Sequence, residues 1–191
     1  MHKVLVIDNY DSFTYNLVHA LQELLNHDVV VKRNDQVAMD YIDQFDYIIL
    51  SPGPGVPDEA GDLKKIIELY APTKKMLGVC LGQQAIGEVF GAKLRNLDEV
   101  YHGVQTSFKS LNNCSIFDNI DTEFLAGRYH SWVIDKETMP DDLIITCTDE
   151  HNEIMGIKHA EYNVYGVQFH PESVLTPEGE TMLSNFLSIT N

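Results

Sequence analysis

The stretch that decides the fold runs from Met76 to Gln84 and has the sequence MLGVCLGQQ. Its first four residues form a short apolar run, which is typical of a strand buried on both faces of a sheet. A helical pattern covers residues 84–90, so Cys80 falls at the turn between a strand and a helix. Turns of this kind connect the strands of a sheet that is covered by helices, and the preceding residues show the same alternation.

Strand and helix patterns alternate through the first half of the chain. Apolar runs occupy residues 4–7, 29–31 and 47–50, and helical patterns occupy residues 11–25, 37–42 and 61–70. From about residue 94 to 169 short alternating strands follow, such as residues 143–145 and 164–167, and a last helix covers residues 177–189. The sequence therefore predicts an α/β fold over residues 1–191 as a single domain. Its open, mostly parallel, twisted sheet carries helices on both faces and an added antiparallel region.

Composition and charge narrow the classes of protein. Hydrophobic residues make up 44% of the 191 residues and charged residues 22%, which is ordinary globular usage. Lys and Arg total 13 against 29 Asp and Glu. The basic residues are scattered, whereas nucleic-acid binding needs clustered cations, so we expect no nucleic-acid partner. The apolar runs are too short to span a bilayer and the chain starts in a strand pattern, so we expect a cytoplasmic protein without a membrane partner.

The cysteines and histidines predict no metal and no cofactor in this chain. Cys80, Cys114 and Cys147 are widely spaced and form neither a disulfide framework nor a CxxC site. We expect Cys114 and Cys147 to be small buried hydrophobes. The eight histidines lack metal-ligand spacing, and the first strand is followed by DNYD rather than a glycine-rich dinucleotide fingerprint.

Cys80 is flanked by Gly78 and Gly82, each two residues away. A sharp strand-to-helix turn strains its central residue and needs small neighbours, and it lifts the central side chain out of the sheet. The free amides at the helix start favour negative charge on the sulfur. A nucleophilic cysteine and a core cysteine at a tight turn both fit this pentapeptide.

A second motif, QFHPE, occupies residues 168–172. Pro171 disfavours helical geometry at His170, and residues two apart in an extended segment point to the same side. Glu172 can therefore orient the His170 imidazole, as the third member of a nucleophile, base and orienter arrangement requires. Taken alone, the motif also fits a surface turn.

A third motif, PGPG, occupies residues 52–55 after the strand at 47–50. Its glycines let the backbone approach a ligand, and a free amide there can point at an oxyanion alongside the amide of Leu81. One such donor is typically worth roughly 3 to 4 kcal/mol of the reaction barrier. An ordinary loop of turn-forming residues is the alternative.

Together, residues 52–55, 78–84 and 166–172 resemble the three ordered motifs of the class I, or triad, glutamine amidotransferases, which have a flavodoxin-like sheet. Residues 8–14 (DNYDSFT) and 128–131 (RYHS) are similar to the branch that serves chorismate-using enzymes. The resemblance implies that Cys80 is the nucleophile, His170 the base and Glu172 its orienter. It also implies oxyanion amides at Gly53 and Leu81, and a glutamine site made by Gly53, Pro54, Gly55, Gln84, Ser131 and Trp132.

The chain departs from the family pattern at two positions: Gln83 stands where His is usual, and Trp132 where Leu is usual. Gln83 is expected to lie beside the pocket with little effect on the chemistry. The larger Trp132 side chain is expected to reshape the glutamine pocket while leaving its backbone contacts in place.

The resemblance further implies that ammonia released from glutamine passes to a separate chorismate-utilising synthase subunit, which would hold Mg²⁺. The product of that subunit would be anthranilate or aminodeoxychorismate, and residues 55–57 (GVP) favour anthranilate. Two other classes remain open. A cysteine hydrolase or esterase is disfavoured because its acid normally comes from a different loop than its base. A catalytically dead binding subunit would be marked by a lost triad residue, and all three are present.

Overall fold

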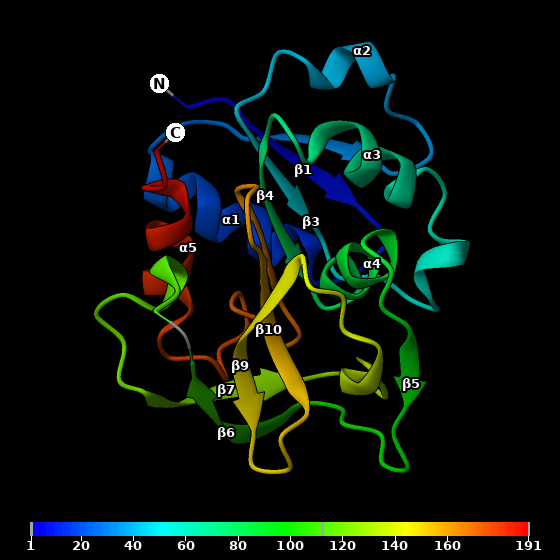
Figure 1. Cartoon of the computed structure of the whole chain (residues 1–191). Coiled ribbons are helices and arrows are strands. Elements are labelled where there is room, and N and C mark those ends of the chain that lie inside the picture. The colour runs from blue at the N-terminus through cyan, green and yellow to red at the C-terminus, as the bar shows by residue number, and fades with distance from the viewer. Residues whose placement is uncertain (1, 112, 191) are drawn as a thin grey trace.

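A computed structural model describes residues 2–111 and 113–190 (Figure 1). Its strands are β1 Val4–Asp8, β2 Val30–Arg33, β3 Tyr47–Leu50, β4 Lys75–Val79, β5 Leu94–Asn96, β6 Val104–Ser110, β7 Glu123–Arg128, β8 Trp132–Ile134, β9 Leu143–Asp149, β10 Ile154–His159 and β11 Val164–Val167. Its α-helices are α1 Thr14–Leu25, α2 Met39–Ile42, α3 Leu63–Tyr70, α4 Leu81–Val89 and α5 Gly179–Leu187. Short 3-10 turns are η1 Pro57–Glu59, η2 Ser115–Phe117 and η3 Lys136–Thr138.

Within the described residues one sheet of nine strands has the order β2-β1-β3-β4-β11-β10-β9-β6-β7, and β5 pairs with β8 in a separate ribbon. The first five strands of the sheet are mutually parallel. Their order matches the flavodoxin-like arrangement. The remaining four strands pair antiparallel. The predicted α/β sheet with an antiparallel addition is therefore confirmed.

The position of β11 differs from the prediction. The alternating pattern at residues 164–167 predicts part of the antiparallel addition, but β11 runs parallel to β4, with Gly166 opposite Gly78, and antiparallel to β10. The pattern indicates which faces of a strand are buried and gives no information on the direction of its neighbours. β11 is thus the strand that joins the two halves of the sheet.

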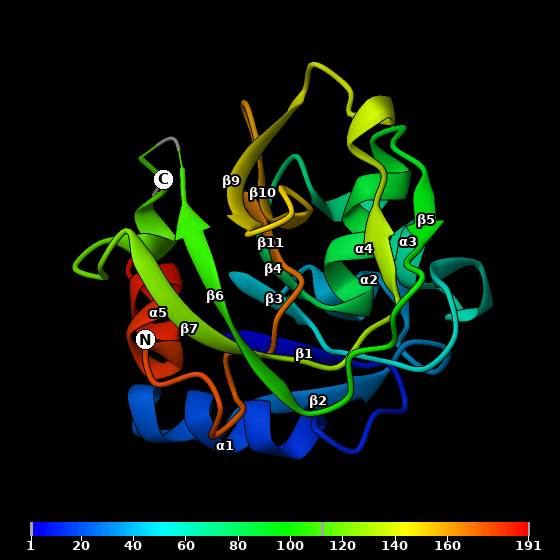
Figure 2. The same cartoon turned by 90° about the horizontal axis from the view of Figure 1, so that it is seen from below.

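The helices cover both faces of the parallel half (Figure 2). α1 and α5 lie together on one face, and α3 and α4 lie on the other. Strand β1 shows why its sequence is apolar throughout. Val4 and Val6 pack into the core under α1 and α5, whereas Leu5 and Ile7 pack into the core on the other face. Because successive side chains of a strand point to opposite faces, a strand between two helical layers needs apolar residues at every position.

Two helices begin at residues other than those predicted. α1 begins at Thr14, whereas the sequence predicts a start directly after a cap at Asp11 or Ser12. The Asp11 carboxylate accepts a hydrogen bond from the backbone N–H of Phe13 in a turn before the helix. α4 begins at Leu81, directly after the nucleophile candidate, rather than at Gln84. No helix in the described ranges is long and apolar enough to cross a membrane.

Candidate active site

Cys80 occupies a strained turn at the carboxyl end of β4. Its φ of 53° and ψ of −104° are unusual for a residue with a side chain. A Cβ on Gly78 would lie 2.4 Å from the carbonyl carbon of Gly82, and a Cβ on Gly82 would lie 2.5 Å from the Leu50 oxygen. The Cys80 N–H donates to Val167 O at 2.8 Å, which ties the turn to β11. The two flanking glycines are therefore required by close backbone contacts.

The start of α4, directly after Cys80, has backbone amides without an acceptor in the helix. The first helical hydrogen bond runs from Gln84 N–H to Cys80 O at 3.1 Å. The amides before Gln84, including that of Leu81, therefore have no acceptor within the helix. Gly53 lies against this turn, since a Cβ there would be 2.5 Å from Leu81 Cδ2. This contact brings the two predicted oxyanion residues together, while their role stays a prediction.

The segment after β1 holds the 52–55 loop in place. The Asn9 N–H donates to Ser51 Oγ at 2.9 Å and its side-chain amide donates to Ser51 O at 2.7 Å. Asn34 Nδ2 in turn donates to Asn9 Oδ1 at 3.0 Å. The residues at 8–14 that mark the family branch thus include one that supports the loop containing Gly53.

His170 and Glu172 form a buried pair. His170 Nδ1 lies 2.7 Å from Glu172 Oε1, and the two side chains are 2% and 0% exposed. The His170 backbone is held by Gly127 O, which accepts its N–H at 3.1 Å, and by Thr176 Oγ1, which donates to its carbonyl at 2.6 Å. Since the ring and the carboxylate are adjacent, the arrangement fits a base and its orienter.

Neighbouring groups set the charge of the His170 ring. Burial alone would lower the pKa of His170, but the nearby Cys80 thiol and the Glu172 carboxylate outweigh burial and raise this pKa above its ordinary value. A hydrogen bond with the Cys80 thiol contributes to this raised pKa, and Nε2 has no other hydrogen-bond partner among the described residues. The ring is therefore suited to take the thiol proton, and its Nε2 is free to pass that proton to a leaving group.

A pocket of about 210 Å³ opens onto Cys80. It is lined by Gly53, Pro54, Gly55, Cys80, Gln84, Tyr129, His130, Ser131 and Trp132. All six residues of the predicted glutamine site line this pocket together with the nucleophile. Tyr129 and His130 were not among the predicted site residues, and the RYHS motif at 128–131 is the signal that locates them.

A buried ion pair holds the pocket wall at His130. Arg128 Nη1 lies 3.0 Å from Asp149 Oδ2, and these side chains are 2% and 1% exposed. Arg128 Nε donates to His130 Nε2 at 3.3 Å, so the other ring nitrogen must bear the proton. His130 Nδ1 therefore donates to Trp132 O at 3.0 Å. Burial and the Arg128 charge lower the pKa of His130 to about 3, which keeps the ring neutral.

The two departures from the family pattern lie in different surroundings. Trp132 lines the pocket, and its carbonyl accepts a hydrogen bond from Gln84 Nε2 at 3.0 Å, so a backbone contact with the pocket is present. Gln83 is fully buried outside the pocket and packs against Gly166, where a Cβ would lie 2.9 Å from Gln83 Cγ. Neither Gln83 amide atom has a hydrogen-bond partner among the described residues.

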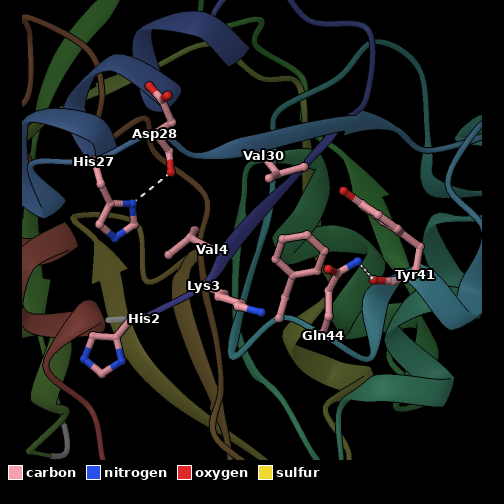
Figure 3. A pocket seen from close by; sticks show the side chains of 9 residues that line it. His2, Lys3, Val4, His27, Asp28, Val30, Tyr41 and Gln44 are labelled. Carbon is pink, nitrogen blue, oxygen red and sulfur yellow. Dashed lines mark hydrogen bonds between the residues drawn. The ribbon is translucent and has the colours of Figure 1, made fainter.

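A larger hollow of about 320 Å³ lies at the amino ends of β1 and β2, whereas Cys80 lies at the carboxyl end of β4. Figure 3 shows the side chains that line this hollow. Its side chains come from the start of β1, the segment around β2, and α2 with the residues after it, and they include Lys3, His27 and Tyr41. The carboxyl ends of the strands, where Cys80 lies, are the usual ligand sites of such sheets. The smaller pocket at Cys80 is therefore the candidate active site.

The other two cysteines lie in the core, away from any cluster of described metal-ligating side chains. Cys114 and Cys147 are buried and unpaired, which confirms the prediction for them, and burial raises the pKa of each thiol. In residues 2–111 and 113–190 no group of three His, Cys, Asp or Glu side chains is placed to hold a metal ion.

Comparison with known proteins gives consistent results. Residues 5–189 match the family model of class-I glutamine amidotransferases. The chain is 45% identical to anthranilate synthase component 2 of Cyanophora paradoxa, covering 98% of this chain and 100% of the relative. It is 44% identical to aminodeoxychorismate synthase component 2 of Escherichia coli, over 96% of this chain and 98% of the relative.

A solved structure supports the same assignment. A putative GMP synthase protein of Thermoplasma acidophilum superposes with a TM-score of 0.87 at 28% identity, covering 98% of this chain and 92% of the other. With the match of the family model over nearly the whole length, these similarities place this chain in the class-I glutamine amidotransferase family.

Proposed function

We propose that this chain is the glutaminase subunit of an anthranilate synthase. It hydrolyses L-glutamine and passes ammonia to a separate chorismate-utilising synthase subunit. The observation that carries the proposal is Cys80 on its strained turn beside the buried His170–Glu172 pair, in the lining of a pocket that the predicted glutamine residues also line. The name of the Cyanophora relative supports the choice of pathway.

The proposed reaction is acyl transfer. His170 takes the Cys80 proton, and the sulfur attacks the side-chain amide carbon of glutamine. The oxyanion is stabilised by the amides of Gly53 and Leu81. His170 then gives its proton to the departing ammonia, and a water molecule, deprotonated by the same ring, hydrolyses the thioester to glutamate and restores the thiol.

The main alternative is the glutaminase subunit of aminodeoxychorismate synthase, or one chain shared by both enzymes. The Escherichia coli relative has that name and is nearly as similar to this chain. Either enzyme would work in the cytoplasm and hold Mg²⁺ in its synthase subunit. This chain would need neither a metal nor a cofactor.

The chemistry is tested with Cys80→Ser in the complex with its synthase partner. We expect the variant to lose product formation from glutamine and to keep product formation from added ammonia. Equal loss with both nitrogen sources would mean that Cys80 is structural. Full glutamine-dependent activity in the variant would mean that the chain uses another nucleophile.

The pathway is tested by mixing the chain with each candidate synthase subunit, glutamine and chorismate, and identifying the product by mass. Anthranilate supports the proposal, and aminodeoxychorismate as the sole product would replace it with the alternative. The isolated chain should hydrolyse glutamine more slowly than the complex.

A further inference from the structure

In the sequence, Gln168 directly follows β11 and precedes His170 by two positions. Its side chain contacts the sulfur of Cys80. The residue is fully buried, and its Nε2 donates to Cys80 Sγ at 3.5 Å. Its Oε1 accepts a hydrogen bond from Gln84 Nε2 at 3.2 Å. Neither the resemblance to the family nor the proposed reaction gives this side chain a role.

The neighbouring groups determine which end of the Gln168 amide faces the sulfur. The carbonyl oxygen of Trp132 can only accept a hydrogen bond. The end of the Gln84 amide that faces this oxygen must therefore be the NH₂ group of Gln84. The second hydrogen of this NH₂ points at Gln168, which must therefore present its oxygen to Gln84. The NH₂ of Gln168 is then left facing Cys80, where the sulfur is the acceptor.

We propose that Gln168 is a positioning residue that holds the Cys80 sulfur and stabilises its thiolate form before glutamine binds. The proposal rests on the proposed function only in taking Cys80 as the nucleophile. A thiolate accepts hydrogen bonds but cannot donate them, and hydrogen bonds to charged groups are stronger than those to neutral ones. An N–H aimed at the sulfur therefore favours the reactive form.

His170 and Gln168 act on the sulfur in different ways. The Cys80 thiol interacts with the His170 ring and contributes to its raised pKa, and this is the contact along which the proton moves. Gln168 supplies a hydrogen bond to the sulfur that leaves Nε2 free for proton transfer. Its own amide is fixed through Gln84 and Trp132 to the wall of the glutamine pocket.

Gln83 offers a matched control within the same region. Both glutamines are fully buried, and Gln83 follows Cys80 by three residues, but its amide has no hydrogen-bond partner in the described part of the chain. Replacing either glutamine by leucine removes the same chemical group from the interior. Only the change at position 168 removes a hydrogen bond to the sulfur.

The test is the rate of Cys80 alkylation by iodoacetamide against pH, measured by mass spectrometry of the Cys80 peptide so that Cys114 and Cys147 do not contribute. In Gln168→Leu we expect the rate near neutral pH to fall about tenfold, the factor expected for one hydrogen bond to a charged group. The plateau at alkaline pH should stay at the wild-type rate. Gln83→Leu should follow the wild-type curve.

Gln168→Met is the second variant, because its unbranched side chain is close in size to glutamine and stays informative if Gln168→Leu fails to fold. A thioether cannot donate a hydrogen bond, so the rate near neutral pH should fall by a similar factor. A wild-type profile in the folded variants, or an equal loss at every pH, overturns the role of Gln168. That result leaves the proposed function intact, since the proposed function is decided separately by Cys80→Ser with glutamine and ammonia.

Discussion

Two buried histidines contribute to the candidate site, one from each half of the sheet, and their surroundings act on them in opposite directions. His170 follows the parallel strand β11, where Cys80 and Glu172 outweigh burial and raise its pKa. His130 follows the antiparallel strand β7, where burial and Arg128 lower its pKa to about 3. The parallel half thus provides the ring that we propose as the proton carrier, and the antiparallel half provides a neutral ring with a fixed tautomer that supports the pocket wall.

The largest effect is expected when the proton carrier of the parallel half is removed. His170→Gln can still donate to Glu172 but cannot take the thiol proton, so glutamine-dependent activity of the complex should fall about 10,000-fold. Activity with added ammonia should persist. The exposed His19→Gln on α1 is the control. Substantial activity with glutamine in His170→Gln would mean that His170 is not the base, so that the two histidines would not differ in the way proposed.

A smaller effect is expected when the support of the antiparallel half is weakened. Asp149→Asn leaves the Arg128 charge buried without its partner, which typically costs about 3 kcal/mol of unfolding free energy. The melting temperature should fall by roughly 10 °C. Because His130 and the Trp132 carbonyl are held through Arg128, KM for glutamine should rise more than kcat falls.

The control for this change is Glu153→Gln, which breaks the neighbouring and more exposed pair with Arg95. Its effect on unfolding should be below about 1 kcal/mol. Urea unfolding and steady-state kinetics measure both variants. Equal destabilisation by the two changes would mean that the buried Arg128–Asp149 pair contributes no more to the free energy of unfolding than the more exposed Arg95–Glu153 pair does.

The smallest effect concerns the pH dependence of stability. The pKa of His130 is lowered in the folded state. Its contribution to the free energy of unfolding is therefore present at pH values above the unfolded-state pKa near 6.5, and it is lost as the pH falls below that pKa. At one pH unit below that value the loss is about 1.4 kcal/mol. For His170 the pKa is raised, so its contribution is present below the unfolded value and is lost as the pH rises above it.

Urea unfolding at several pH values tests this sign. Because the contribution of His170 changes in the opposite direction over the same range, each variant is compared with the wild type. Relative to the wild type, His130→Gln should become more stable as the pH falls from above to below about 6.5, whereas His19→Gln should follow the wild-type profile. If His130→Gln retains the wild-type pH dependence, the ring is not held neutral in the folded protein.

Much of the parallel half can be predicted from the sequence because its signals are local. The glycines around Cys80 and the proline after His170 act on adjacent residues, and the structure places both motifs at ends of neighbouring strands. The ion pair that supports the pocket wall from the antiparallel half cannot be predicted in the same way. Arg128 and Asp149 are charged residues, which are expected at the surface, and their pairing spans 21 positions of sequence.

The contact of Gln168 with the sulfur also cannot be predicted from the sequence, although Gln168 belongs to the QFHPE motif. Its hydrogen bond to Cys80 joins residues 88 positions apart and depends on the orientation of an amide that Gln84 fixes. The direction of β11 relative to its neighbours differs from the prediction for a related reason, since strand pairing is decided by distant segments.

The pairing of β4 with β11 has a mechanical consequence. Val79 lies opposite Val167 in the sheet, and Cys80 and His170 follow these residues by one and three positions. Thermal displacement of the two strands therefore moves sulfur and imidazole in the same direction, and their separation changes less than either position does. Bending of the sheet is thus largely decoupled from the distance across which the proton must travel.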